Sequence, residues 1–335
     1  MIKKVVIFIT LAMICQIALA VRLPIYLDWR SSLAYSIYDL SDHISSKLAE
    51  LYKVNAGIDT LFANGIRTRL ELSNEEKRLV SQVIIKHAII DYICEDYEVQ
   101  LSIQDYGYGK VFFINNRRND HPFYDQNALA NYRWHGISYT QKLSNHSLGL
   151  GVGSNDVNIF LSDLNYRFKL NPVDLQVFGI YAHKDSRYTT IKYHLGYDAT
   201  VAFKNWQLRS GYVFEHIPEH KNIVEMDGWH LINELSYSIN DNIKTIISIE
   251  HQNQLAKSET DHLYEACIDL KYKKLQNYVG LNTRSLPDEE AITYFLDLNF
   301  HPVQDLVLGA FFDYVNLSKS NDYMKFGLQT RFRMK

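Results

Sequence analysis

The sequence predicts an all-β fold, a transmembrane antiparallel up-and-down β-barrel. Three observations predict it: apolar and polar residues alternate along each expected strand, short and long connections alternate between strands, and long apolar runs are absent beyond residue 20. In residues 188–203, YTTIKYHLGYDATVAF, one alternate set is apolar or aromatic and the other is polar, charged or small. This pattern is typical of a β-strand, because successive Cβ atoms point to opposite faces. At about 3.4 Å per residue the strand would be about 50 Å long and could cross a bilayer.

Beyond residue 20 the sequence has no run of about eighteen apolar residues, the length that a transmembrane helix needs. Strands must therefore meet the membrane, and a closed barrel is the remaining way to pair every backbone group within lipid. We expect each strand to turn its apolar set outward and its polar set toward a wet interior.

The N-terminal residues have the features of a secretory signal peptide. Lys3 and Lys4 precede an apolar run, and Ala18-Leu19-Ala20 stands where cleavage is expected. We therefore predict a signal peptide over 1–20 and a single outer-membrane barrel domain over 21–335.

Charge and cysteine content exclude other classes of protein. A formal net charge of −3, with both signs intermixed, gives no indication of a nucleic-acid partner. Bulky residues precede Cys15, which disfavours a lipoprotein. Cys94 lies near an expected turn and Cys267 within an expected strand, so no disulfide is predicted.

The chain divides into eighteen expected strands, seven before residue 158 and eleven from there on. An even number places both ends of the barrel on the periplasmic side. Sixteen strands are the alternative, because residues 41–50, SDHISSKLAE, could be helical. The seven earlier strands are expected at 31–38, 51–62, 65–73, 79–92, 97–107, 130–141 and 146–153.

Short and long connections alternate strictly from residue 158 onward. Short turns rich in Asn, Asp and Pro are expected at 171–174, 204–205, 240–242, 273–277 and 301–305. Longer connections are expected at 183–187, 216–227, 253–261, 285–290 and 316–322. This sorting is typical of outer-membrane barrels, which have short periplasmic turns and long outer loops.

Aromatic residues gather near the expected strand ends, where outer-membrane barrels have interfacial girdles. Cross-strand packing in a soluble sheet is the alternative explanation for any single pair. The candidates are Phe203, Trp206, Trp229, Tyr237, Tyr272 and Phe332.

One segment resembles a known family. Residues 84–113, IIKHAIIDYICEDYEVQLSIQDYGYGKVFF, resemble a hairpin of the eighteen-stranded alginate-export and capsule-assembly barrels. The matching positions are Lys86, Ala88, Tyr92, Gln104, Tyr106 and Gly107. Ser102 and Ile103 replace the Gly-Arg step that this family tends to have, so the resemblance implies the barrel class and no particular substrate.

Charged residues on the expected inward faces are candidates to line a pore. They are Lys192, Asp198, Arg209, Glu234, Glu250, Glu265, Asp269, Asp297, Lys325 and Arg331. Facing charges would orient polar solutes and select ions, whereas mutually neutralising pairs would only fill the interior. The connection 108–127 carries Arg117, Arg118 and Asp120, and it either stays on the surface or enters the lumen as a constriction.

The sequence contains no phosphate-binding loop or zinc spacing, and no cofactor or metal is predicted. The segment 215–220 offers His and Glu donors, but Pro218 argues against a helical site and a solvated acidic loop is favoured. His146 and Ser147 have the residue types of a barrel hydrolase, yet they are adjacent beside an expected turn. An enzyme is therefore not expected.

These features predict a porin-like channel in the outer membrane of a two-membrane bacterium, open to passive diffusion of small polar solutes or ions. The expected partners are outer-membrane lipid, the solutes and a barrel-assembly machinery. The oligomeric state stays open. The alternatives are a structural or adhesion barrel with a plugged lumen and an outer-membrane barrel hydrolase.

Overall fold

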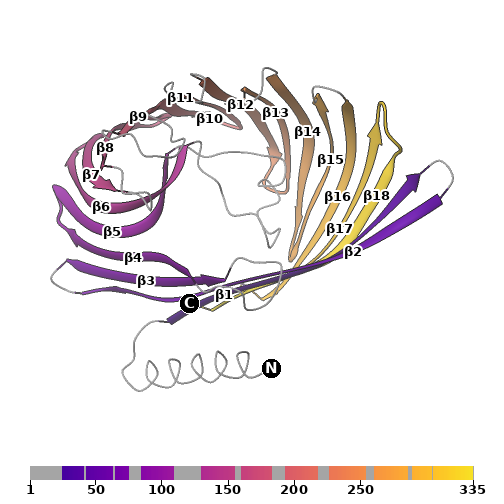
Figure 1. Ribbon diagram of the computed structural model, residues 1–335, viewed down its shortest axis with the longest axis horizontal. Helices are drawn as coiled ribbons and strands as arrows, with labels where there is room; N and C mark the ends of the chain where they lie inside the picture. Colours follow the sequence, from indigo (N-terminus) through magenta and orange to yellow (C-terminus); the bar gives the residue numbers. More distant parts are fainter. Residues whose placement is uncertain are drawn as a thin grey trace, which may run out of the picture.

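The computed structural model describes residues 25–40, 43–62, 65–74, 84–108, 130–154, 160–182, 193–217, 226–253, 260–285, 289–303 and 305–334. These residues form one sheet of 18 antiparallel strands, each paired with its neighbours in the chain. β1 also pairs with β18, from Leu27 opposite Met334 to Tyr38 opposite Tyr323, which closes the sheet into a barrel (Figure 1). The predicted fold class is confirmed.

The strands of the first half are β1 (Ile25–Leu40), β2 (His43–Leu61), β3 (Ile66–Asn74), β4 (Ile84–Ile93), β5 (Tyr97–Tyr108), β6 (Ala130–Leu143), β7 (His146–Ser154), β8 (Phe160–Leu170) and β9 (Val173–Ala182). Those of the second half are β10 (Tyr193–Phe203), β11 (Trp206–Ile217), β12 (Met226–Asn240), β13 (Ile243–Asn253), β14 (Thr260–Tyr272), β15 (Leu275–Ser285), β16 (Glu290–Val303), β17 (Leu306–Leu317) and β18 (Tyr323–Met334).

The count of eighteen is confirmed, and the sixteen-strand alternative is wrong. Residues 43–50 belong to β2, where His43 lies opposite Leu40 and Glu50 opposite Leu33 on β1. Ladder hydrogen bonds to β1 therefore override the helix-like spacing of this segment. The predicted signal peptide, residues 1–20, lies outside the described residues and stays a prediction.

The strand bounds confirm the alternation of connections. Residues 171–172, 204–205, 241–242 and 273–274 are two-residue turns on one rim of the barrel. Four predicted turns are shorter than expected, since β9 and β15 already begin at Val173 and Leu275. β12 and β16 continue to Asn240 and Val303. β1 begins and β18 ends at the rim of the short turns, as predicted (Figure 1).

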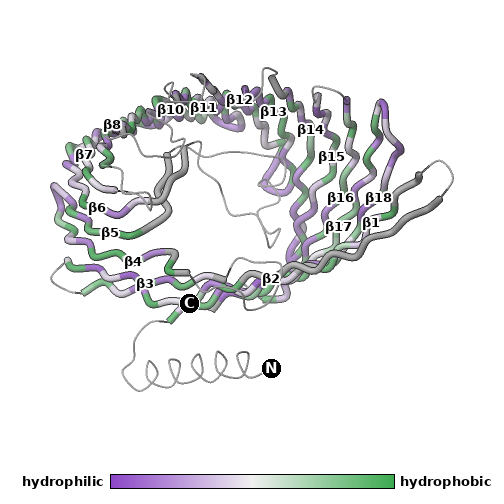
Figure 2. The backbone as a smooth tube through the Cα atoms, in the orientation of Figure 1, coloured by the Kyte–Doolittle hydropathy of each residue, from purple (hydrophilic) through white to green (hydrophobic). Residues whose placement is uncertain are grey.

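The two faces of each strand differ in exposure, as the alternation predicts. On β13, Ile247 is 57% exposed while its neighbours Ile246 and Ser248 are buried. Hydropathy alternates along the strands in the same way (Figure 2). Large apolar side chains therefore cover the outer surface, which is the surface that lipid requires. No helix in the described part of the chain is long and apolar enough to span a membrane.

The predicted aromatic positions lie near strand ends on the outward face. Phe203 and Tyr272, which end β10 and β14, are 61% and 62% exposed. The rings of Trp206 and Tyr237 are 4.4 Å apart beside the same rim. Lys204 and Lys273 follow with positive φ, and their ammonium groups lie over the rings of Phe203 and Tyr272. Aromatic bodies with cationic neighbours suit the level of lipid headgroups.

The inward set is more apolar than predicted, which corrects the expectation of a polar interior. Large side chains on the inner wall are buried among polar ones: Trp134, Phe178, Ile232, Ile246, Tyr278, Phe295, Val307 and Phe311. Several face a glycine on the next strand, as Phe295 faces Gly280 and Phe311 faces Gly327. A Cβ at Gly280 would lie 2.8 Å from Phe295 Cζ, so the missing side chain leaves room for the ring against the wall.

Candidate functional site: the inner wall of the barrel

Carboxylates concentrate on the inward faces of four strands, β12, β13, β14 and β16. They belong to Glu234, Glu250, Glu265, Asp269 and Asp297, and all five residues are buried. Asp297 is fully shielded, at 0% exposure, and lies between Tyr278 on β15 and Phe311 on β17 in the register. All five were predicted to face the interior.

Polar neighbours on the same wall stabilise several of these carboxylates. The His230 ring nitrogen Nε2 lies 2.6 Å from Glu250 Oε1. Asp269 accepts hydrogen bonds from Gln276 and has the Lys271 ammonium at 3.7 Å. Buried charges are tolerated only when such groups compensate their desolvation.

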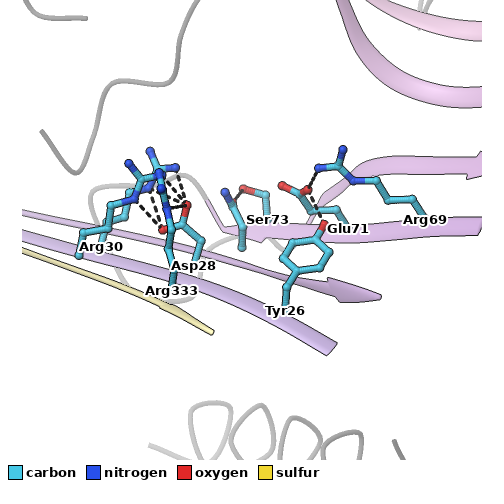
Figure 3. A network of polar contacts seen from close by, with 9 residues as sticks. Tyr26, Asp28, Arg30, Arg69, Glu71, Ser73 and Arg333 are labelled. Atoms are coloured by element: carbon cyan, nitrogen blue, oxygen red, sulfur yellow. Dashed lines mark hydrogen bonds and ion pairs between the residues drawn. The ribbon is translucent and has the colours of Figure 1, made fainter. Parts of the chain in front are cut away.

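Arginines gather on the inner wall where β1 meets β18. Asp28 Oδ2 lies 2.6 Å from Arg30 Nη2, 2.9 Å from Arg331 Nη2 and 3.8 Å from Arg333 Nε. Arg30 and Arg331 are directly opposite in the register. One carboxylate therefore contacts three guanidinium groups (Figure 3).

A second polar cluster lies beside it on β1, β2 and β3. Glu71 Oε2 accepts hydrogen bonds from the Tyr26 hydroxyl at 2.5 Å and from Arg69 Nη2 at 2.6 Å (Figure 3). The Ser73 hydroxyl donates to Asn55 on β2 at 2.6 Å. These contacts fix side chains from three strands, so the wall here is preorganised.

Two predicted residues form a pair on β10 and β11. Arg209 donates to Asp198 from Nε at 2.9 Å and from Nη2 at 3.0 Å, in the fork geometry that suits Arg and carboxylate. Glu234 lies directly opposite Arg209 on the other side. The structure thus brings three of the predicted residues together in one row.

The remaining candidates divide into placed and undescribed residues. Lys325 lies opposite Asp313 on β17, with its ammonium 5.3 Å from the Phe311 ring. Arg331 joins the cluster around Asp28. Lys192, Arg117, Arg118 and Asp120 lie outside the described residues, so their roles in a pore or a constriction stay predictions.

The sequence reasoning missed the charged residues of β1 and β3. Tyr26, Asp28 and Arg30 alternate with Leu27 and Trp29, so the period-two signal was present. It was overlooked because β1 was expected to begin at residue 31 and in fact begins at Ile25. The cluster at the seam also depends on pairing with β18, which local sequence does not reveal.

The hydrolase alternative finds no support in the geometry, whereas Glu219 and His220, two donors of the possible cation site, lie outside the described residues. Among the described residues, no group of three or more His, Cys, Asp or Glu side chains could hold a metal ion. Leu148 and Leu150 are exposed on β7 while Gly149 and Gly151 are buried, so His146 faces outward and Ser147 inward. His146 instead contacts the Tyr166 hydroxyl at 2.5 Å. Adjacent residues on opposite faces cannot act as nucleophile and base.

A closed antiparallel barrel with an apolar exterior and a charged inner wall defines the class of transmembrane β-barrels. No protein-family model and no curated protein matches the sequence.

Solved structures match almost the whole chain. OccK9 (OpdG) of Pseudomonas aeruginosa has a TM-score of 0.59 at 8% identity, over 92% of this chain and 97% of that chain. The outer membrane protein OpdK of the same species has 0.56 at 9% identity, over 93% and 99%. A mutant of the porin of Rh. blastica has 0.54 at 10% identity, over 92% and 100%. The chain therefore has the fold of these proteins. These matches do not test the resemblance to alginate-export barrels, which stays a prediction.

Proposed function

We propose that the protein is an outer-membrane channel through which small polar solutes or ions diffuse passively along a charged inner wall. The observation that carries the proposal is the closed ring of 18 strands with apolar side chains outside and acidic and basic side chains inside. The structural likeness to outer-membrane porins supports it, and OpdK has been crystallised with vanillate, a small solute.

The charge distribution supports selectivity for polar solutes. Carboxylates dominate β12, β13, β14 and β16, and arginines gather where β18 meets β1. Opposite charges on different arcs of one wall create a field across the interior, which orients dipolar solutes and discriminates between ions. Lys192, Arg117, Arg118 and Asp120 are proposed to add to this lining.

The experiment is single-channel recording of the purified protein in planar bilayers. A channel gives discrete conductance steps that scale with salt concentration. Sustained silence of protein that is shown to be inserted and folded would refute the proposal. It would favour the structural or adhesion barrel with a plugged lumen instead. The low exposure of inward side chains favours this alternative, since Asn299 and Trp134 are each 1% exposed.

The proposal includes export and assembly. Residues 1–20 would direct secretion and be removed, and a barrel-assembly machinery would insert the single domain 21–335 into the membrane. Mass spectrometry of the protein from outer membranes tests this. A mature chain that begins at Val21 is expected, and an intact Met1 in folded barrels would contradict it.

A further inference from the structure

Two histidines face each other on the outer surface of the barrel, near the ends of β13 and β14. His251 on β13 lies directly opposite His262 on β14. Both belong to the outward set of their strands, because Glu250 and Glu265 are buried on the inner wall and side chains alternate between faces. The two imidazole rings therefore lie on one face of the sheet and at the same level.

The geometry brings two ring nitrogens of this pair into contact. His251 Nδ1 is 2.5 Å from His262 Nδ1, and the ring planes are inclined at 79°. The ring of Tyr264 meets that of His251 edge-on, with centroids 5.8 Å apart. Two neutral imidazole nitrogens in this position can share a proton, or both can bind one metal ion. Metal–nitrogen bonds of about 2.0–2.1 Å at a right angle place the two nitrogens about 3 Å apart, so the rings need to separate by only about 0.5 Å.

Asn253 supplies a third donor atom on the same face. It follows His251 by two residues on β13 and is therefore also outward. Its side-chain oxygen is shielded from solvent and accepts no hydrogen bond from any described residue. A shielded amide oxygen without a partner costs free energy, which a bound cation would recover. This set differs from groups of three His, Cys, Asp or Glu side chains because its third donor is an amide oxygen.

The pair lies at a level that dissolved ions can reach. β13 ends at Asn253 and β14 begins at Thr260, so the two histidines are close to the rim of the long connections. Trp229 on β12, one of the predicted girdle residues, lies directly opposite Asn253. Aromatic girdles mark the interface between membrane and water. A hydrated metal ion would therefore meet these side chains without crossing the apolar layer of the membrane.

The neighbours of the pair on the adjacent strands are uncharged. Leu231 on β12 lies opposite His251, and Ser285 on β15 lies opposite His262. Neither side chain would repel a cation between the two imidazoles.

We propose that His251 and His262 bind a divalent transition-metal ion, with Asn253 as the third ligand, and that this ion joins β13 to β14 at the outer rim. Imidazole suits Cu²⁺, Ni²⁺ and Zn²⁺, and sites with nitrogen and oxygen ligands generally bind Cu²⁺ most tightly of these. Mg²⁺ and Ca²⁺ prefer oxygen ligands alone and are not expected to bind. The site goes beyond the proposed channel function, since it requires the closed barrel and not an open lumen.

The experiment titrates Cu²⁺ into the folded full chain in detergent, prepared without a polyhistidine tag and freed of metal. Electron paramagnetic resonance then reports how many nitrogens bind the ion. The unmodified protein is expected to take up one equivalent of Cu²⁺ with coupling to two imidazole nitrogens. His251→Gln and His262→Gln are each expected to lose one nitrogen coupling and to weaken binding by at least the roughly 10–100-fold that loss of an outer-shell partner costs. Asn253→Ala is expected to weaken binding and to keep both nitrogens.

The matched control is His146→Gln. His146 also faces outward, on β7, but its Nδ1 contacts the Tyr166 hydroxyl and not a second imidazole. The two-nitrogen signal is expected to be unchanged in this variant. Thermal unfolding gives a second readout, because an ion that binds only the folded barrel raises its stability. Zn²⁺ is expected to raise the unfolding temperature of the unmodified protein and of His146→Gln, and Mg²⁺ to leave both unchanged.

Three results would overturn the site. The first is a Cu²⁺ signal from the unmodified protein that lacks coupling to two nitrogens. The second is a two-nitrogen signal that persists in His251→Gln and in His262→Gln, because the ion would then be bound elsewhere. The third is a Zn²⁺-dependent rise in unfolding temperature that is as large in these two variants as in the unmodified protein. Failure of the channel is distinguishable from failure of the site, because conductance is recorded without added metal and metal binding is measured without a bilayer.

Discussion

Gly196 on β10 lies directly opposite Phe178 on β9, and a Cβ at position 196 would stand only 2.6 Å from Phe178 Cζ. The same Cβ would meet the Tyr212 carbonyl oxygen on the other side. We expect Gly196→Ala to lower the free energy of unfolding by about 1–3 kcal/mol, because overpacking forces the backbone to shift. Urea unfolding in detergent measures this effect.

Two variants test the cause. Phe178→Ala in the Gly196→Ala background is expected to recover part of the lost stability, since it removes one of the two clashes. Gly179→Ala is the matched control on β9, because its Cβ would meet only the flexible tip of Leu195 at 3.1 Å and a distant carbonyl. Equal losses for Gly179→Ala and Gly196→Ala would contradict this account.

Lipid exposure of Ile247 gives a second prediction. This side chain is 57% exposed on β13, well inside the strand. Ile247→Arg is expected to destabilise the barrel in vesicles by about 2–4 kcal/mol, as charges on the lipid face near the midplane do. Tyr272→Arg, at the end of β14, is the control with an expected loss of about 0–1 kcal/mol. Equal losses of stability in Ile247→Arg and Tyr272→Arg would contradict the placement of Ile247 near the middle of the lipid layer.

The arginine cluster at the seam gives a third prediction. Asp28→Asn would leave Arg30, Arg331 and Arg333 without their shared carboxylate. We expect the permeability ratio to shift toward anions, with lower thermal stability because like charges then face one another. Reversal potentials in a salt gradient measure the shift. Asp174→Asn, which removes one carboxylate beside the exposed Arg167, is expected to change the ratio less.

The fourth prediction concerns Asp322, in the connection between β17 and β18. We expect the stability of this connection to depend on pH. A hydrogen bond from the Tyr314 hydroxyl at 2.5 Å, together with the Leu317 N–H, holds the pKa of this carboxyl below its ordinary value. A carboxyl group whose pKa is lower in the folded than in the unfolded state stabilises the fold at any pH above its ordinary pKa. That stabilisation is lost as the pH falls through the pKa of the folded state.

Hydrogen exchange of residues 317–322 checks this sign. Protection of the Leu317 amide is expected to fall as the pH is lowered from about 5 to about 3, across the ordinary range of aspartate. Asp322→Asn is expected to show low protection throughout, and Tyr314→Phe to move the loss to a higher pH. Unchanged protection in Asp322→Asn would show that the carboxylate does not hold the connection.

The fold could be predicted largely because period two is a local property. Leu296, Leu298 and Phe300 alternate with polar residues along the second half of β16, and lipid requires that pattern on almost every strand. Residues 43–50 were ambiguous because Ile44 and Leu48 are four apart, a spacing that also fits a helix. Pairing with β1, a non-local interaction, decides their structure.

The inner wall was predictable only strand by strand. Alternation identified Asp198 and Arg209 as inward, and their short connection made the pair foreseeable. It could not foresee Asp28 with Arg331, which are 303 residues apart in the sequence. Nor could it foresee Phe311 inside the barrel, because an apolar inward residue looks like an error until Gly327 opposite provides the space.

Pairing of β1 with β18 makes the molecule a ring in which no strand holds a privileged position. The ends of the described chain meet at one rim, so a short peptide linker could join them and the chain could be opened at another connection. Such a circular permutant would keep every cross-strand register while changing which strand is synthesised first. Its refolding rate would reveal whether closure or the order of synthesis limits assembly.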